Sequence, residues 1–190
     1  MQFETFAPLA GLDFITHAFT LRTINDTRAG DYESRVARQF GFPALARADQ
    51  PHGAGVAIVT TPGAVTGADA LVTRQRNLPL LIRCADCAPV FIVDRKTPAI
   101  ALVHSGKKGT LANVVGQTLK QMPNADFAFI GPCIGPCHYE MDLWSEIEKQ
   151  LAGLEVHNPR ICTACHLDRY FSYRAERGNT GRMFALLALK

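Results

Sequence analysis

The sequence lacks a long apolar run, since no stretch approaches the roughly 18 residues that a membrane-spanning helix needs. It also lacks a basic segment followed by an apolar one near its start, so we expect no signal peptide and a cytoplasmic location. Dense basic patches are missing too: the net charge is only +3, and Lys107 and Lys108 form the one pair of adjacent lysines. We therefore expect neither a membrane nor a nucleic acid as partner, and favour a small-molecule substrate.

The motifs of common nucleotide-binding folds are also absent. The chain carries neither a glycine-rich dinucleotide-binding fingerprint nor a phosphate-binding P-loop. It shows no internal repeat, low-complexity tract or linker. With 190 residues, of which 47% are hydrophobic and 19% charged, it has the composition of a globular protein with a core of its own. We expect one domain over residues 1–190.

Glycines and prolines divide the chain into short apolar segments typical of strands and amphipathic segments typical of helices. Expected strands are residues 13–20, 55–60, 68–73, 78–83, 89–94, 99–103, 126–130 and 183–189. Expected helices are residues 33–40, 110–122 and 143–154. Because the strands come in runs rather than in strict alternation with helices, the pattern predicts a layered α+β fold and not a doubly wound one.

Two histidines and one cysteine stand at predicted strand ends or turns. His52 follows Gln50-Pro51, Cys87 lies in the break between two apolar strands, and His104 ends a third strand. Two imidazoles and a thiolate are suitable zinc ligands, and three protein ligands leave a fourth position for water, as in catalytic zinc sites. The alternative without a metal is a Cys87–His104 nucleophile–base pair. A third possibility is that each residue is an ordinary, satisfied part of the core or a loop.

The six cysteines are expected to be free thiols, because the chain shows no export signal and can build a core without disulfides. The Cys84–Cys87 and Cys162–Cys165 pairs each have the spacing of a zinc knuckle, so a four-cysteine site is an alternative. It is disfavoured because residues three apart on a regular strand face opposite sides. A redox pair at Cys84 and Cys87 is disfavoured because no helix N-terminus follows.

Residues 131–140 form a loop rich in glycine and proline, which is typical of rigid segments that shape a site. His138-x-Glu140 after Pro132-Cys133 has the wrong order and spacing for a base-deaminase zinc motif. The simpler interpretation is a packed turn with two small buried thiols, Cys133 and Cys137.

An anion site is expected at residues 105–110, where glycines and the Lys107-Lys108 pair lead into the predicted helix 110–122. An exposed basic turn is the equally simple alternative. Single cations that could add to an anion site are Arg22, Arg174 and Arg182.

Taken together, these motifs resemble the YfiH-like laccase-domain family, also called multicopper polyphenol oxidase-like. The matching pieces follow the family's order along most of the chain: His17-Ala-Phe-Thr-Leu-Arg22, Gln50-Pro-His52-Gly53, Asp69-Ala-Leu-Val-Thr73, Ala85-Asp-Cys87-Ala-Pro-Val90, Val103-His-Ser-Gly106, Gly131-Pro-Cys-Ile-Gly-Pro-Cys137, Tyr139-Glu140, Cys162-Thr163, Phe171-Ser-Tyr-Arg174 and Thr180-Gly-Arg182.

The resemblance implies a four-layer α/β/β/α sandwich with mixed sheets. It implies zinc, with copper as the alternative, held by His52, Cys87 and His104. It associates the chain with purine nucleoside chemistry: phosphorolysis of adenosine, inosine or methylthioadenosine, and deamination of adenosine. The expected catalytic residues are Cys87, His104 and Asp86. The residues expected to bind substrate or phosphate are Arg22, Lys107, Lys108, Cys137 and Arg174.

The chain also departs from the family pattern. Lys107-Lys108 stands where the family has Trp-Arg, and the segment after Arg22 is short. After Glu140 the chain runs directly into Met141-Asp-Leu-Trp144, so an intervening helix is deleted. These differences predict a compact variant with an intact metal triad and altered substrate walls.

The favoured function is thus a zinc-binding purine nucleoside enzyme. The alternatives are a Cys–His amidase acting in peptidoglycan editing, a single-copper polyphenol oxidase, and an inactive, metal-stabilised binding module. A full multicopper laccase is disfavoured because its copper cluster needs more histidines than the six of this chain.

Overall fold

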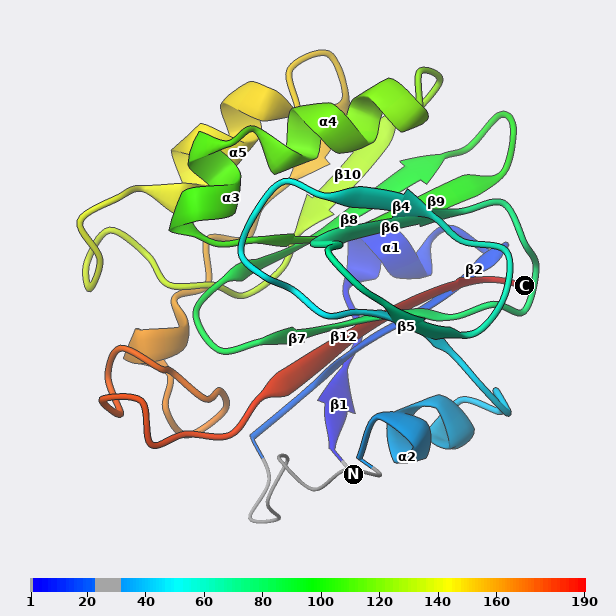
Figure 1. Ribbon diagram of the computed structural model, residues 1–190. Helices are drawn as coiled ribbons and strands as arrows, with labels where there is room; N and C mark the ends of the chain where they lie inside the picture. The colour runs from blue at the N-terminus through cyan, green and yellow to red at the C-terminus, as the bar shows by residue number, and fades with distance from the viewer. Residues whose placement is uncertain (1, 23–31) are drawn as a thin grey trace.

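Two six-stranded mixed sheets form the frame of the structure, a computed structural model that describes residues 2–22 and 32–190 (Figure 1). The strand order of the first sheet is β1-β2-β12-β7-β3-β5. Its strands are β1 (Phe3–Glu4), β2 (Ile15–Thr20), β3 (Ala46–Ala48), β5 (Gly63–Val65), β7 (Leu80–Cys84) and β12 (Met183–Leu189). Strand β3 runs parallel to both β5 and β7, and the remaining pairs are antiparallel.

The second sheet has the order β11-β10-β8-β9-β6-β4. Its strands are β4 (Val56–Ile58), β6 (Ala70–Thr73), β8 (Ala88–Asp94), β9 (Ala99–Ser105), β10 (Phe127–Ile130) and β11 (Glu155–His157). The helices are α1 (Ala7–Ala10), α2 (Tyr32–Gln39), α3 (Lys107–Leu111), α4 (Val114–Gln121) and α5 (Leu143–Gln150), with a 3₁₀ turn η1 at Thr163–Cys165. No helix in the described residues is long and apolar enough to cross a membrane.

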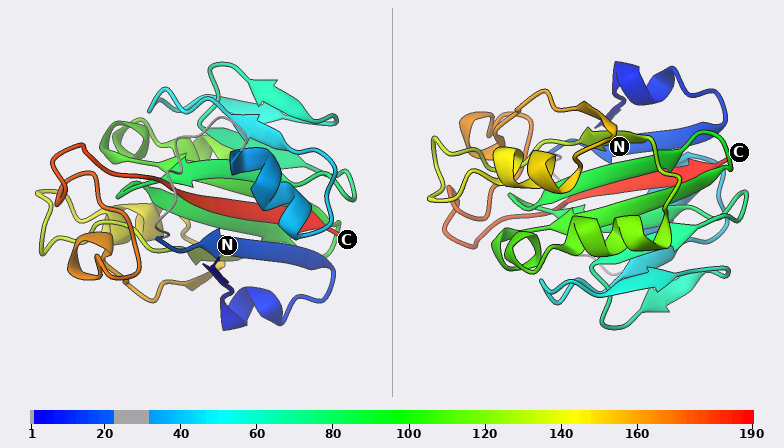
Figure 2. Two further views of the ribbon diagram at one scale, coloured as in Figure 1. Left: turned by 90° about the horizontal axis from the view of Figure 1, so that it is seen from below. Right: turned by 90° about the horizontal axis from the view of Figure 1, so that it is seen from above.

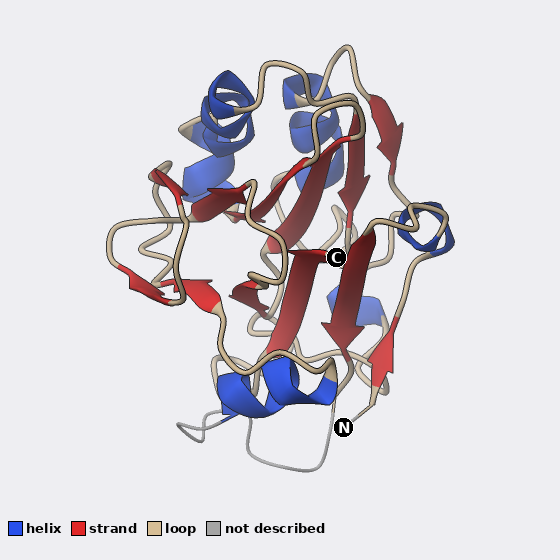
Figure 3. Ribbon diagram, turned by 90° about the vertical axis from the view of Figure 1, so that its right-hand side faces the viewer, coloured by secondary structure: helices blue, strands red, loops and turns tan. Residues whose placement is uncertain are grey.

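Three buried clusters define the layers. The largest lies between the sheets, where Leu80 and Ile82 of β7 face Phe91 of β8 and Leu102 of β9. A second cluster joins the other face of the second sheet to α4 and α5, which lie over that sheet in the right-hand view of Figure 2. A third joins α2 to the outer face of the first sheet. Figure 3 shows the sheets between these helical groups, so the α+β prediction is confirmed.

Covered faces explain why the central strands are apolar at nearly every position. In β12, Ala185 and Leu187 point into the cluster between the sheets, whereas Phe184 and Leu186 point toward α2. Strands buried on both faces are continuous apolar runs rather than alternating ones. The strand predicted at 183–189 is accordingly confirmed with the same bounds.

The single helix predicted over residues 110–122 is wrong. The structure has two helices, α3 starting already at Lys107 and α4 starting at Val114. Asn113 separates them in a left-handed conformation, with φ of 60°. Its side chain occupies the space beside Gly116, where a Cβ atom would lie 2.4 Å from Asn113 Oδ1. The apolar periodicity continues across this break, so the pattern did not reveal it.

Four short strands and one helix were not predicted: β1, β3, β5, β11 and α1. The structure therefore has more elements than the eight strands and three helices that the sequence pattern predicts. The ends of β7, β8 and β9 and the loop after β3 converge at one edge of the two sheets.

His17 is a buried titratable group in β2, and its stability effect can be tested. Its Nε2 accepts a hydrogen bond from the Phe6 amide at 2.8 Å. Burial, together with the positive charge of Lys190, lowers the pKa of His17 from 6.5 to about 4. Between these two values the unfolded chain binds a proton that the native protein does not, so the free energy of unfolding decreases as the pH falls from 6.5 toward 4.

We therefore expect the His17→Gln variant, which keeps a hydrogen-bond acceptor but cannot titrate, to lose less stability than the wild type over this pH window. Urea unfolding followed by circular dichroism at several pH values measures the difference. Parallel stability profiles for the two proteins would contradict the assignment.

Candidate active site

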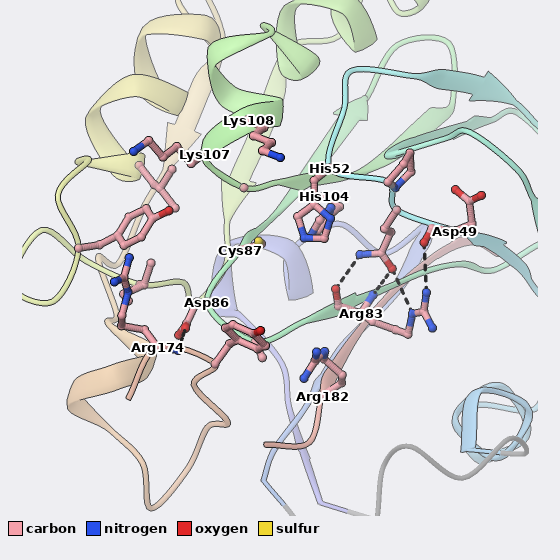
Figure 4. Close-up of a pocket in the computed structure, with 18 of the residues that line it drawn as sticks. Asp49, His52, Arg83, Asp86, Cys87, His104, Lys107, Lys108, Arg174 and Arg182 are labelled. Atoms are coloured by element: carbon pink, nitrogen blue, oxygen red, sulfur yellow. Dashed lines mark hydrogen bonds between the residues drawn. The ribbon is translucent and has the colours of Figure 1, made fainter. Parts of the chain in front are cut away.

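A pocket of about 1150 Å³ opens where the sheet ends converge (Figure 4). Its lining comes from the loop after β3, the β7–β8 turn, the end of β9 with the start of α3, and the loops around residues 134–143 and 173–182. Loops held by a rigid sheet frame commonly carry the functional residues of a protein. The lining includes Asp49, Gln50, His52, Arg83, Asp86, Cys87, His104, Lys107, Lys108, Ile134, Tyr139, Leu143, Tyr173, Arg174, Arg177 and Arg182.

The structure brings together the three predicted metal ligands. The donor atoms of His52, Cys87 and His104 all lie within 4.8 Å of one another. The two imidazole rings are nearly perpendicular, with centroids 4.8 Å apart. His52 is exposed, Cys87 half-buried and His104 buried, so the cluster faces the pocket from its floor.

Asp69 holds both histidines in place, and it is the main residue of the site that the sequence analysis did not single out. One carboxylate oxygen accepts hydrogen bonds from His104 Nδ1 at 2.9 Å and from the His52 amide at 3.0 Å. The other accepts the Gly53 amide at 2.6 Å. A carboxylate on Nδ1 fixes the ring and leaves Nε2 as the metal-binding nitrogen. The sequence feature that could have identified Asp69 was its place in the Asp69–Thr73 motif, one of the pieces that match the family.

The backbone leaves space for this cluster. A Cβ atom on Gly106 would lie 2.6 Å from Cys87 Sγ and 3.6 Å from the His52 ring. His52 and Asp86 have positive φ values of 65° and 89°, which are uncommon for residues other than glycine. Such strained positions commonly mark functional sites. Gly106 and these two turns together keep the three donor groups close without filling the space between them.

The protonation states of the triad fit a metal site better than a nucleophile–base pair. Burial, with the negative charge of Asp86, raises the pKa of Cys87 to about 12. Burial also lowers the pKa of His104, although its hydrogen bond to Asp69 opposes that shift. Both changes disfavour a thiolate–imidazolium pair. Two imidazole nitrogens and one thiol that loses its proton on metal binding fit zinc or copper.

Asp86, a predicted catalytic residue, lies beside Cys87 but is engaged in holding loops. Its carboxylate accepts hydrogen bonds from Thr163 Oγ1 and from the Arg174 amide, both at 2.7 Å. Its own carbonyl accepts the Ile134 amide at 2.8 Å. This arrangement favours a positioning role, and a catalytic role for Asp86 stays a prediction.

The pocket is rich in positive charge. Of the side chains that line it, six are Lys or Arg and two are Asp. Glu140 pairs with Lys107 at 2.8 Å and with Arg174 at 3.2 Å. The Arg174 guanidinium also lies over the Tyr139 ring, 4.8 Å from its centroid. Among the described residues, Lys108 has no ion-pair partner, and its side chain extends over the His52 side of the pocket in Figure 4.

Two residues expected at the substrate site lie elsewhere. Arg22 pairs with Glu176 at 2.7 Å and lies over the Phe171 ring. Cys137 lies beside Cys165, with their sulfur atoms 3.5 Å apart. Neither is among the residues that line the pocket. A role of either residue in binding substrate or phosphate stays a prediction. Arg83 and Arg177, which the sequence analysis did not name, do line it.

The four-cysteine alternative is also not realised. Cys84 is buried inside the cluster between the sheets, whereas Cys162 and Cys165 lie with Cys137 and His138. The loop at 131–140 has one buried thiol, Cys133, and not two, because Cys137 is exposed.

Comparisons with known proteins agree with this geometry. The family model described as multi-copper polyphenol oxidoreductase laccase matches residues 25–142 and 138–190. A purine nucleoside phosphorylase YlmD of Geobacillus stearothermophilus is 30% identical over 241 aligned positions, covering 97% of this chain and 85% of the relative. A purine nucleoside phosphorylase of Deinococcus radiodurans is 30% identical and covers 96% of this chain and 83% of the relative.

Solved structures show the same fold. The crystal structure of YlmD from Geobacillus stearothermophilus superposes with a TM-score of 0.86 at 23% identity, covering 94% of this chain and 93% of that one. The Bacillus licheniformis protein YfiH gives a TM-score of 0.85 at 22% identity, with 93% of both chains covered. The family match over most of the chain confirms the resemblance drawn from the motifs: the protein belongs to the YfiH-like family of multi-copper polyphenol oxidoreductase laccase domains.

Proposed function

We propose that this chain is a zinc-dependent purine nucleoside phosphorylase. The carrying observation is that one pocket combines the His52–Cys87–His104 cluster with six cationic side chains. Two relatives that align with nearly the whole chain are named purine nucleoside phosphorylases. A wall of cationic side chains suits a phosphate substrate, and metal donors beside it could stabilise charge that develops on the nucleoside.

The size and lining of the pocket suit these two substrates. Its volume of about 1150 Å³ is slightly above the usual range for ligand pockets, which leaves room for a nucleoside and a phosphate together. Ile134, Leu143 and the Tyr139 and Tyr173 rings offer apolar surface for a purine base. The cations on the other walls offer charge-assisted hydrogen bonds to phosphate oxygens.

In phosphorolysis, a phosphate oxygen forms a bond to the anomeric carbon of ribose while the bond from that carbon to the purine nitrogen breaks. The electron pair of the broken bond goes to the purine, which takes up a proton, and the sugar leaves as ribose 1-phosphate. The cationic side chains bind the attacking phosphate and orient it beside the sugar. Lys108 is a suitable candidate among these, because it has no ion-pair partner in the described part of the chain, whereas Lys107 and Arg174 are engaged with Glu140.

Zinc bound at the triad supplies Lewis-acid chemistry that stabilises negative charge developing on the substrate. The protein's part is to hold the ligands: Asp69 fixes the His104 ring and the His52 backbone, and Gly106 leaves the space between them open. Asp86 accepts hydrogen bonds from the Thr163 hydroxyl and the Arg174 amide, so the wall that faces the triad keeps its position.

Multicopper oxidation has less support. The six histidines all lie in the described residues, and only His52 and His104 line the pocket. His17 is buried against Phe6, and His157 pairs with Glu155. The Cys87–His104 amidase has less support as well, because burial keeps both groups uncharged in the absence of a metal.

Product analysis tests the proposal directly. The zinc-loaded protein is incubated with adenosine, with and without phosphate, and the products are separated by chromatography. We expect adenine and ribose 1-phosphate only when phosphate is present, and no product from the His104→Ala variant. Inosine formed without phosphate would assign deamination instead. The absence of any product from the zinc-loaded wild type would overturn a nucleoside activity and favour a binding module.

Replacing Asp69 by Asn is expected to weaken metal binding about 10- to 100-fold, because the loss of a carboxylate partner of a ligand histidine has effects of this size. The matched control is Asp49→Asn, which changes a carboxylate at the same pocket that bonds the Gly67 amide and neither histidine. Zinc affinity is measured by competition with a chelator. Equal zinc affinities for the two variants would show that Asp69 does not support metal binding.

Replacing Lys108 by Gln is expected to raise the KM for phosphate about tenfold, which corresponds to the loss of one charged hydrogen bond. The KM for the nucleoside should stay near that of the wild type. Lys96→Gln, a change in the turn between β8 and β9 outside the pocket, is the control. An unchanged KM for phosphate in Lys108→Gln would assign phosphate binding to other cations of the pocket.

A further inference from the structure

A second cluster of metal-binding side chains lies outside the pocket. It consists of Cys137, His138, Cys162 and Cys165, whose donor atoms all lie within 4.8 Å of one another. Cys137 and His138 come from the loop after β10, and the other two come from the loop that contains η1. None of the four lines the candidate active site. The proposed phosphorolysis gives these residues no role.

The distances match those around a single tetrahedral ion. Zinc bonds of about 2.3 Å to sulfur and about 2.0 Å to nitrogen place neighbouring ligands roughly 3.5 to 3.8 Å apart in a tetrahedron. In the structure, His138 Nδ1 lies 3.3 Å from the sulfur of Cys137, 3.5 Å from that of Cys165 and 3.8 Å from that of Cys162. The sulfur atoms of Cys137 and Cys165 are 3.5 Å apart.

Two tight turns produce this arrangement. The His138 amide donates to the Gly135 carbonyl at 3.0 Å, and the Cys165 amide donates to the Cys162 carbonyl at 3.2 Å. Each turn folds the chain back so that its ligands face the other loop. The two loops are joined by a parallel bridge between Cys133 and Cys162, with backbone hydrogen bonds of 3.1 Å on both sides. The cluster is therefore held by backbone structure that does not depend on the side chains themselves.

A backbone amide also points at one of the sulfur atoms. The Gly135 amide donates to Cys162 Sγ at 3.2 Å. Hydrogen bonds from amides to ligand sulfurs are the kind of outer contact that orients metal ligands. Gly135 has no room for a side chain, since a Cβ atom there would lie 2.3 Å from the Trp144 ring. The packing of Trp144 thus fixes the amide that faces Cys162.

We propose that Cys137, His138, Cys162 and Cys165 bind a structural zinc ion. Three thiolates and one imidazole are a common structural zinc set, and four protein ligands leave no open position for a substrate. This separates the cluster from the triad, which offers three ligands and faces a pocket. A disulfide between Cys137 and Cys165 would use only two of the four converging groups and would leave His138 and Cys162 unexplained.

The ion would fix one wall of the candidate active site. Thr163 lies between two of the ligands in sequence and donates to Asp86, the neighbour of Cys87. Asp86 also accepts the Arg174 amide, and its carbonyl accepts the Ile134 amide. Ile134 and Arg174 both line the pocket. Zinc at the cluster would therefore tie together the two loops that carry much of the pocket wall.

The first test is metal content. Protein purified with a thiol reductant and loaded with zinc is expected to retain about two zinc ions per chain after removal of excess metal. Cys165→Ser should retain about half as much, as should His104→Ala, and the double variant should retain almost none. His166→Ala, which removes an exposed histidine next to Cys165 that is not in the cluster, is the matched control and should behave as the wild type.

Cobalt substitution identifies which site is lost. Cobalt bound by three thiolates gives much stronger sulfur-to-metal absorption than cobalt bound by one, so Cys165→Ser should lose most of this absorption and His104→Ala only a small part. Zinc retention by Cys165→Ser equal to that of the wild type would overturn the second site, whatever the outcome for nucleoside turnover. Loss of zinc from His104→Ala alone tests the triad separately.

Thiol protection in the unaltered protein covers the case in which Cys165→Ser fails to fold. Cys137 and Cys165 are exposed, so an alkylating reagent reaches them freely unless a metal holds their sulfurs. We expect zinc to slow alkylation of these two cysteines at least about tenfold, and a chelator to restore it. Equal alkylation rates with and without zinc would overturn the proposal. A Cys137–Cys165 disulfide in protein purified with a thiol reductant would overturn it as well.

Discussion

The candidate active site depends on the hydrogen bonds that the buried carboxylate of Asp69 accepts. This carboxylate is fully buried and accepts three hydrogen bonds, from the His104 ring and from the amides of His52 and Gly53. A buried charge is tolerated only when such partners satisfy it. Two of the three donors belong to His52 and His104. The same hydrogen bonds that satisfy the buried carboxylate therefore also hold these two histidines close together.

A second carboxylate, that of Asp86, holds the loops around the pocket in the same way, through the hydrogen bonds that it accepts. The sheets place the β7–β8 turn firmly, since β7 and β8 are central strands with both faces covered. From that turn Asp86 bonds Thr163 and the Arg174 amide, which belong to long segments with little regular structure. The sheets thereby set the position of these irregular loops, which carry cationic side chains of the pocket wall.

The predictable part of the fold is the part governed by burial. The strands at residues 89–94 and 183–189 are apolar runs because helices cover one face and the other sheet covers the opposite face. The short strand β5 was missed because it is an edge strand whose three residues are mostly exposed. Strand β3 was missed because three residues, with only Ala46 and Ala48 facing the core, are too few to form a recognisable apolar pattern. The break at Asn113 was missed because its cause is one left-handed residue whose side chain needs the space beside Gly116.

The same distinction applies to the two clusters of metal donors. His52, Cys87 and His104 could be named as candidates because each lies at a predicted strand end or turn, and the family resemblance then singled them out as a ligand set. The cluster at Cys137 and Cys162 could not, because its ligands come from two loops whose meeting depends on the Cys133–Cys162 bridge. The zinc-knuckle spacing of Cys84 and Cys87 does not make a site, in agreement with the sequence analysis, which disfavoured one: Cys84 points into the core from β7, while Cys87 has already left the strand. The sequence can therefore indicate a metal site whose ligands lie at the ends of regular strands. A site whose ligands lie in irregular loops depends on tertiary contacts that the sequence does not reveal.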